Sequence, residues 1–203
     1  MVWERNRRRR IIRTGTLWHD LAALIVQQRV RTEDAADSWR AMIHALGEHA
    51  PGPLDLRLPP AHELVATLPY ERFHPFGIER SRAASLRRVA RAMPRLEGSV
   101  DAPFAEVEPR LRAVPGIGQW TAAGVESLTW GSADAVILGD VKLPELVCWF
   151  LAHEEWGDDA RMLELLEPYR PHRYRVIQMS YASGARVPRR RPTRYGVQDI
   201  RRR

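Results

Sequence analysis

The amino-acid sequence predicts an all-α fold. Apolar residues recur at helical spacing through most of the 203 residues, and no more than short stretches show the alternation typical of a half-buried strand. Two helical patterns flank a glycine-containing turn at 114–118 that is too tight for side chains, which indicates a helical hairpin. The length suits one compact unit with a single core, or two small lobes that share one.

Helical patterns follow one another along the chain. Thr32 is placed to cap the second helix and Gly47 to end it. The proline-rich connection at 48–60 indicates a loop within a domain. The expected helices cover 17–30, 32–46, 61–68, 79–93, 104–111, 120–128, 141–151, 158–166 and 173–183.

Arginines decorate the helix expected at 79–93. A solvated charged face accounts for most of them, because arginine is rarely buried without a partner. They are Arg80, Arg82, Arg87, Arg88 and Arg91.

The charge balance favours a polyanionic partner. The chain has 32 Lys and Arg against 25 Asp and Glu, a net charge of +7 and a pI near 10.4, so binding to such a partner should depend on salt. An arginine-rich coding bias would give the same composition without a binding face. Charge therefore supports nucleic acid as a partner without proving it.

Basic segments stand at both ends of the chain. Residues 1–13 show little periodicity, and we expect an arm that is either loose or lies along a phosphate backbone. Residues 186–203 form a second basic tail, expected to be disordered or to track DNA. The helical domain is expected to span 14–185.

Cysteine and histidine usage excludes several kinds of site. Cys148 is the only cysteine, so the chain can form neither an internal disulfide nor the four-thiolate set of an iron–sulfur cluster. His74 has no companion at ligand spacing, and no transition-metal site is expected. No signal peptide or membrane-spanning apolar run is visible. We expect a cytoplasmic, monomeric protein without a membrane partner; a bacterial, nucleoid-associated location is implied only by the family resemblance described below.

The turn at 114–118 has the features of a phosphate-binding hairpin. Its glycines, Gly116 and Gly118, allow positive φ and let a ligand approach the backbone. The free N–H groups that open the following helix point outward with the positive end of its dipole. Asp140 follows a short span later, after Ile137-Leu-Gly139.

These residues carry a family resemblance. The string Val-Pro-Gly-Ile-Gly-Gln-Trp-Thr-Ala-Ala at 114–123, with Asp140 at this spacing, resembles the signature of the helix-hairpin-helix (HhH-GPD) DNA glycosylases, and most of all the 3-methyladenine DNA glycosylase II type. The resemblance runs from about Thr14 to Arg186. It implies two small helical lobes with the active-site cleft between them. It also implies a base-excision repair enzyme that acts on damaged bases in double-stranded DNA.

Asp140 is the candidate catalytic residue. Its position before a helix suits an N-cap equally well, and the two roles are compatible because a capping carboxylate is held rigidly. Cleavage of an N-glycosidic bond develops positive charge on the sugar, which an ionised carboxylate stabilises while it orients or deprotonates the attacking water. The resemblance decides this otherwise even choice in favour of catalysis.

Aromatic residues are candidates for the base pocket. N3- or N7-alkylated purines are cationic and stack on electron-rich rings. Trp120 and Tyr181 are the ring candidates, the latter by the resemblance, and Trp18 is a weaker third. For the other tryptophans in helices, a core position is expected: Trp39, Trp130 and Trp149.

Lysine usage predicts a monofunctional enzyme. The resemblance places Trp120 where bifunctional relatives carry a nucleophilic lysine, and Lys142 is the only lysine in the chain. We therefore expect hydrolysis to an abasic site, with a weak lyase activity through Lys142 left open.

Other residues are candidates for DNA contacts. By the resemblance, Gln28 is the wedge that fills the gap left by a flipped nucleotide, and Gln27 is its neighbour. The hairpin contributes Val114, Gly116 and Gly118, and the Thr121 hydroxyl can add a contact. Related hairpins hold a monovalent cation through turn carbonyls, and the sequence leaves that open here.

The substrate is less closely defined than the fold. Alkylated purines of the 3-methyladenine and 7-methylguanine type are the leading expectation. The alternatives are deaminated or mismatched bases, or a DNA-binding hairpin module without catalysis. Many proteins of this type carry an additional N-terminal α/β domain with no counterpart here, so we expect either a minimal form or a truncated chain.

Overall fold

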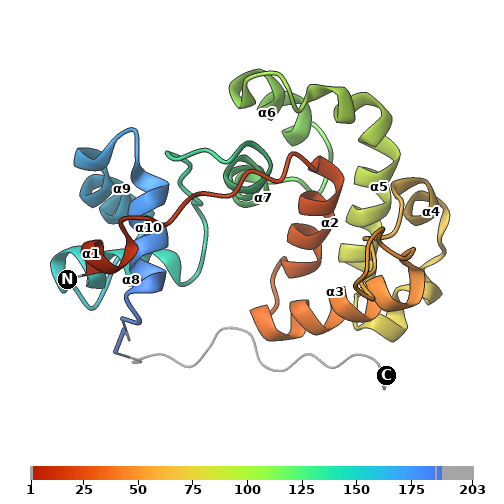
Figure 1. Ribbon diagram of the computed structural model, residues 1–203, viewed down its shortest axis with the longest axis horizontal. Coiled ribbons are helices and arrows are strands. Elements are labelled where there is room, and N and C mark those ends of the chain that lie inside the picture. Colours follow the sequence, from red (N-terminus) through yellow and green to blue (C-terminus); the bar gives the residue numbers. More distant parts are fainter. Residues whose placement is uncertain (1, 186, 189–203) are drawn as a thin grey trace. The chain divides into compact units, whose positions relative to one another are not determined.

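The computed structural model describes residues 2–185 and 187–188. Within these ranges the chain is helical apart from turns, loops and one isolated β-bridge between His49 and Arg57, which confirms the all-α prediction. Figure 1 shows the path of the chain. The α-helices are α1 (Val2–Asn6), α2 (Leu17–Gln27), α3 (Thr32–Leu46), α4 (His62–Thr67), α5 (Arg80–Leu96), α6 (Phe104–Arg112), α7 (Gln119–Val125), α8 (Leu143–Ala152), α9 (Asp159–Leu166) and α10 (Arg173–Ala182). The shorter segments are the 3-10 helices η1 (Tyr70–Arg72), η2 (His74–Phe76), η3 (Glu97–Ser99) and η5 (Glu167–Tyr169), and the π-helical turn η4 (Glu126–Trp130).

The described residues divide into two compact units. The first, which we call the outer unit, contains the chain up to Gly15 and again from Gln119 onward. The second, the inserted unit, is the continuous segment Thr16–Gly118. The hairpin turn therefore ends the inserted unit, and α7 resumes the outer one.

The inserted unit has a core built from α2, α3, α4 and α5. Helix α2 packs against α3 and α5, and α4 packs against α5. The predicted apolar face of α2 is buried, with Leu21 and Ile25 fully enclosed, and α5 buries Leu86 and Met93 in the same way. This is the ordinary consequence of an apolar stripe at helical spacing.

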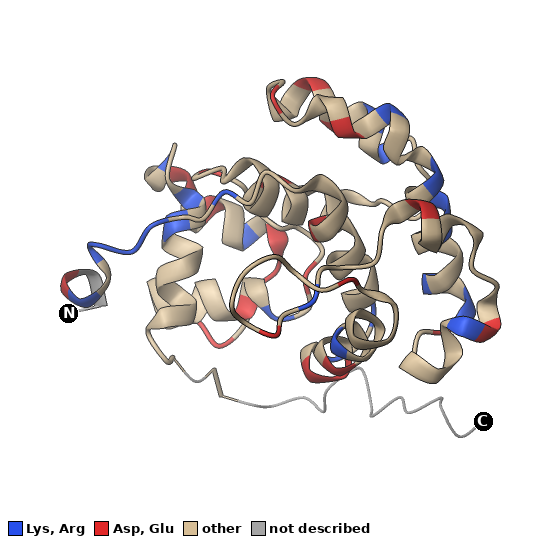
Figure 2. Cartoon of the chain, turned by 45° about the vertical axis from the view of Figure 1, so that its right-hand side comes forward, with Lys and Arg blue, Asp and Glu red and all other residues tan. Residues whose placement is uncertain are grey.

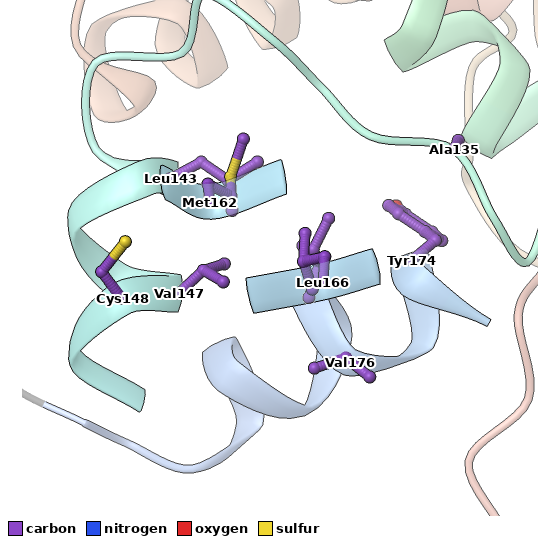
Figure 3. Packing of buried hydrophobic residues seen from close by; sticks show 9 residues of the cluster. Ala135, Leu143, Val147, Cys148, Met162, Leu166, Tyr174 and Val176 are labelled. Atoms are coloured by element: carbon purple, nitrogen blue, oxygen red, sulfur yellow. The ribbon is translucent and has the colours of Figure 1, made fainter. Parts of the chain in front are cut away.

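The outer unit has a core of its own between α8, α9 and α10. Helix α8 packs against both α9 and α10, and Figure 3 shows the enclosed side chains. The buried members of this cluster are Ala135, Leu143, Val147, Cys148, Met162, Leu166, Tyr174, Val176 and Ile177. This core supports the loop that leads to Asp140.

Several helix boundaries differ from the sequence-based expectation. The first predicted helix ends at Gln27 rather than 30, because Gln28 adopts an extended conformation and Arg29 a positive φ of 60°. Helix α8 begins at Leu143 rather than 141. The helix expected at 120–128 is α7 followed by the π-helical turn η4. Boundaries of this kind depend on hydrogen bonds that an apolar pattern does not encode.

The ends of the chain were predicted with mixed success. Residues 2–6 form α1 instead of an irregular arm. The tail at 186–203 lies outside the described residues except for 187–188, so its order and role stay predictions.

None of the helices in the described part of the chain combines the length and the apolar character needed to cross a bilayer.

Candidate functional site

The hairpin turn is fixed by a glycine that no other residue can replace easily. Gly116 has φ of 109°, and a Cβ there would lie 2.6 Å from the Ser85 hydroxyl oxygen on α5. Gly118 differs, because its φ is not positive and nothing lies within 4 Å of a Cβ built on it. Of the two glycines expected to allow positive φ and a close approach of a ligand, Gly116 uses the positive φ, whereas Gly118 does not and has an exposed backbone with room for a ligand.

Two side chains donate to the carbonyl oxygens of this turn. Gln28 Nε2 donates to the Gly116 carbonyl at 2.9 Å. Arg88 Nε donates to the Pro115 carbonyl at 2.9 Å and its Nη2 to the Ser85 hydroxyl at 3.1 Å. The structure thus brings the wedge candidate Gln28 to the hairpin, a contact that the sequence did not predict. It adds Arg88, one of five arginines most of which were expected on a solvated face.

The remaining hairpin candidates occupy less open positions. Gln27 and Val114 are half-buried, and the Val114 carbonyl accepts the Ile117 N–H at 3.0 Å. Thr121 is only 2 % exposed, so its hydroxyl faces the protein interior and is no longer a candidate for a phosphate contact.

Asp140 is held by hydrogen bonds to both carboxylate oxygens. Its Oδ1 accepts the backbone N–H groups of Lys142 at 2.8 Å and of Leu143, the first residue of α8, at 2.9 Å. Its Oδ2 accepts the indole N–H of Trp120 at 3.0 Å. The N-cap of α8 is Lys142, so Asp140 is not the N-cap itself but binds the first N–H of the helix from two residues before the cap. Its other oxygen is bound to α7.

The loop before Asp140 is fixed by a residue that the sequence did not single out. Asp159, at the start of α9, accepts the backbone N–H of Gly139 through Oδ2 at 2.8 Å. An acidic residue in the first turn of a helix is ordinarily explained by the helix dipole, so nothing in the sequence pointed to this contact. It positions the residue that directly precedes the candidate catalytic carboxylate.

Tyr181 extends the group formed by Trp120 and Asp140. It lies on α10, and its side chain is 55 % exposed. Desolvation of the hydroxyl, followed by repulsion from the nearby Asp140 carboxylate and by Tyr174, raises the pKa of Tyr181 to about 12. A neutral phenol, an indole and a carboxylate thus share one part of the outer unit.

Trp18 is enclosed and hydrogen-bonded. It belongs to the inserted unit, is 5 % exposed, and donates its indole N–H to the Pro60 carbonyl at 2.8 Å. The ring also stands edge-on to His62 at a centroid separation of 6.1 Å. These contacts are those of a core residue, and we leave Trp18 out of the proposed base pocket.

The tryptophans assigned to the core are less enclosed than expected. Trp39, Trp130 and Trp149 are half-buried. Trp149 stands edge-on to His153 with ring centroids 5.8 Å apart.

Within residues 2–185 and 187–188, no three or more His, Cys, Asp or Glu side chains gather in a way that suits a metal ion. Cys148 is fully buried in the outer core. The exposed Lys142 contributes its backbone N–H to Asp140.

Comparisons with known proteins place the fold in one class. The search of protein-family models found no match, and neither did the search of curated protein sequences. Solved structures do match, and the fold they share with this chain is that of the helix-hairpin-helix DNA glycosylases. At identities of 20 % or less, this likeness establishes the fold alone.

Three of these structures show the range of the class. A 3-methyladenine DNA glycosylase from Archaeoglobus fulgidus superposes with a TM-score of 0.72 and 20 % identity, over 81 % of this chain and 57 % of its own. The Schizosaccharomyces pombe 3-methyladenine DNA glycosylase in complex with abasic DNA gives 0.72 and 16 %, over 90 % and 91 % of the two chains. The Clostridium acetobutylicum 8-oxoguanine glycosylase/lyase in complex with double-stranded DNA gives 0.67 and 13 %, over 86 % and 61 %. The chain thus spans little more than half of the archaeal protein.

Proposed function

We propose that this protein is a monofunctional DNA glycosylase that excises alkylated purines, of the 3-methyladenine and 7-methylguanine type, from double-stranded DNA. The observation that carries the proposal is the Asp140 carboxylate, oriented by three N–H donors of which one is the indole of Trp120. Its charge also acts on Tyr181, whose pKa is raised by burial and by repulsion from Asp140. The shared fold supports it, since each neighbour described above is a DNA glycosylase.

Asp140 acts on the sugar of the flipped nucleotide. As the C1′–N bond breaks, its electron pair leaves with the base and positive charge develops on the sugar ring. The carboxylate stabilises this charge, and it orients the water whose oxygen forms the new bond to C1′ and accepts the proton that the water loses. Because three donors fix the carboxylate in advance, little reorganisation is needed when the charge appears.

Two aromatic side chains receive the damaged base. An alkylated purine carries positive charge, so stacking on an indole or phenol gains about 0.5–2 kcal/mol from cation–π attraction. The Trp120 N–H is committed to Asp140, which fixes the orientation of its ring. Tyr181 is exposed and its neutral hydroxyl adds no charge to the pocket.

The inserted unit supplies the grip on the DNA. The turn at 114–118 offers exposed backbone at Gly118 for a phosphate. Gln28 is the wedge. When DNA binds, its amide leaves the Gly116 carbonyl and contacts the bases next to the flipped nucleotide. Flipping costs a few kcal/mol, which these contacts offset.

The absence of a suitable amine makes the enzyme monofunctional. A glycosylase that also cleaves the strand needs an amine that attacks C1′. Trp120 carries none, and the chain has a single lysine, Lys142. We also propose that carbonyl oxygens of the turn can bind a monovalent cation. Two of the turn carbonyls, those of Gly116 and Pro115, accept hydrogen bonds from Gln28 and Arg88.

The proposal is tested by measuring base release from methylated duplex DNA with the wild type and with Asp140→Asn. We expect 3-methyladenine or 7-methylguanine to be released by the wild type, and the variant to bind DNA but release base at least 100-fold more slowly, as when a preorganised electrostatic group is removed. Borohydride trapping should give no covalent adduct.

Each other outcome selects an alternative. Release of 8-oxoguanine, or of deaminated or mismatched bases, in place of methylated purines would change the substrate assignment and keep the catalytic one. A trapped adduct would make Lys142 a nucleophile. DNA binding without release of any base from a panel of lesions would identify a non-catalytic binding module.

A further inference from the structure

Arginines of the N-terminal arm line a hollow in the outer unit. The hollow has a volume of about 630 Å³ and is lined by four consecutive arginines, Arg7 to Arg10, together with Ile11 and Arg175. Figure 2 shows the arm as a basic stretch that leads away from α1. Arg175 comes from the first turn of α10, so two segments far apart in the sequence contribute to one cationic site.

The arm that carries these arginines is attached to the rest of the outer unit. The backbone N–H of Thr14 donates to the Leu128 carbonyl at 3.0 Å, and that of Gly15 to the Thr129 carbonyl at 3.3 Å. Arg13 passes so close to Gly131 that a Cβ there would lie 2.9 Å from the Arg13 Cβ. Ile11 packs against the outer core. The arm is therefore fixed rather than loose over these residues.

The charge of this hollow is largely uncompensated. The only ion pair recorded between a lining arginine and a described carboxylate joins Arg7 to Glu4 at 3.8 Å, and both side chains are more than half exposed. Such pairs contribute little. Like charges gathered in one place repel one another, and a bound anion would relieve that repulsion.

The lining favours a polyanion over a small organic ligand. Small-molecule pockets are mostly apolar with a few polar groups, whereas Ile11 is the single apolar side chain that lines this one. Guanidinium groups bind phosphate oxygens in pairs through their planar fork of donors. A row of them suits successive phosphates.

Helix α10 connects the hollow to the candidate active site. Arg175 and Tyr181 lie six residues apart on α10, which is about 9 Å along the helix axis. That rise corresponds to about three base-pair steps of DNA. Their separation along the helix axis is therefore within the span of one duplex.

We propose that this arginine hollow is a second DNA-backbone site, which binds phosphates of the same duplex that presents its damaged base to Asp140. This proposal rests on the proposed function, because only that function makes the ligand a duplex with a damaged base. The hollow acts through charge on any sequence, and its contribution is independent of the hairpin, which belongs to the inserted unit.

The salt dependence of binding tests this proposal. We would measure the affinity for a duplex over a range of salt concentrations with the wild type, with the double variant Arg9→Gln/Arg175→Gln, and with Arg40→Gln/Arg95→Gln. The last is a control with the same loss of charge at exposed positions on α3 and α5. Loss of two phosphate contacts should reduce the slope of log K against log salt by about two in the first variant. The control should keep the wild-type slope, and Arg9→Lys/Arg175→Lys should restore it.

The results separate this proposal from the glycosylase assignment. Equal slopes in the two glutamine variants would overturn the arginine site, even if the wild type releases methylated purines. A reduced slope confined to the first variant would support the site, even if no base is released. Tighter binding of an RNA duplex than of a DNA duplex, lost in the same variant, would overturn DNA as the ligand. Matching thermal unfolding curves would show that every variant is folded.

Discussion

Trp120 contributes both an indole N–H and an aromatic ring, and the two can be separated by substitution. In Trp120→Phe a ring remains, but the hydrogen bond to Asp140 Oδ2, 3.0 Å long, is lost. A hydrogen bond to a charged group contributes about 1.5–3 kcal/mol, so we expect single-turnover base release to slow by about 10- to 100-fold. The measurement is the rate at saturating enzyme, with duplex affinity measured in parallel.

A control variant distinguishes orientation from stacking. Trp120→Ala removes ring and donor together and should be slower than Trp120→Phe. Equal rates for the wild type and Trp120→Phe would show that the hydrogen bond to Asp140 has no part in the chemistry.

The raised pKa of Tyr181 predicts that the free energy of unfolding depends on pH in the alkaline range. Its pKa is raised to about 12 in the folded protein, against about 10 in an unfolded chain. Below pH 10 both states hold the proton and the residue makes no difference. As the pH rises from about 10 towards 12, the unfolded state loses the proton first, so the free energy of unfolding decreases. Denaturant titrations at several pH values should show this decrease in the wild type and a smaller one in Tyr181→Phe.

A titration of absorbance checks the same shift directly. The chain has five tyrosines, and the tyrosinate signal that is missing from Tyr181→Phe should be the one with the high apparent pKa. An ordinary value near 10 for that signal would contradict the desolvation of the Tyr181 hydroxyl and, with it, the repulsion from Asp140.

The hairpin turn offers a matched pair of glycine substitutions. Gly116→Ala should destabilise the protein, because φ of 109° suits glycine alone and the new Cβ would lie 2.6 Å from the Ser85 hydroxyl. The backbone strain contributes about 1–3 kcal/mol. Gly118→Ala meets no such obstacle and should keep its stability, but weaken duplex binding because the methyl group stands where the phosphate approaches. Thermal unfolding and duplex affinity, measured for both variants, check the two effects; loss of stability in Gly118→Ala would contradict this division.

The apolar periodicity of the helices was sufficient to predict the fold class and most of the core. The buried faces of α2 and α5 follow directly from the spacing of Leu21, Ile25, Leu86 and Met93. The choice of Trp120 and Asp140 as site residues came from the resemblance of the hairpin signature, and that of Gln28 from the resemblance of the loop that contains it.

Neither apolar periodicity nor a local motif could predict the long-range polar contacts. Arg82 was expected on a solvated face, yet it is 4 % exposed, paired with Glu79, and donates to the Val26 carbonyl 56 residues away at 2.6 Å. Burial opposes ionisation of Glu79, but the hydrogen bond and charge of Arg82 outweigh it and lower the pKa of Glu79. Arg88 and Asp159 were missed for the same reason, since their partners are backbone groups on other segments.

The division into two units predicts how the chain behaves when it is cut. The inserted unit is one continuous segment, Thr16–Gly118, with its own buried core. A fragment that consists of this segment should fold cooperatively, with a circular dichroism spectrum rich in helix and a single thermal transition. The outer unit is built from two separate segments, so a fragment that begins at Gln119 lacks the arm and should be less stable.

The arm itself provides the control for this experiment. Adding a peptide of residues 2–15 to the fragment from Gln119 should raise its thermal stability, since Thr14 and Gly15 donate to the Leu128 and Thr129 carbonyls. A fragment 16–118 that stays unfolded, or no effect of the added peptide, would show that the two units depend on each other for folding.

The insertion of one unit within the other also sets an order of events during synthesis. The arm leaves the ribosome before the inserted unit, but its partners on the segment from Gln119 follow only after the whole inserted unit has been made. At about 5–20 residues per second, roughly one hundred residues take about 5–20 s, long enough for the inserted unit to fold while the arm waits. A nascent segment that must wait exposed is best kept soluble by charge, and the run of arginines from Arg7 to Arg10 meets that need before it ever encounters a ligand.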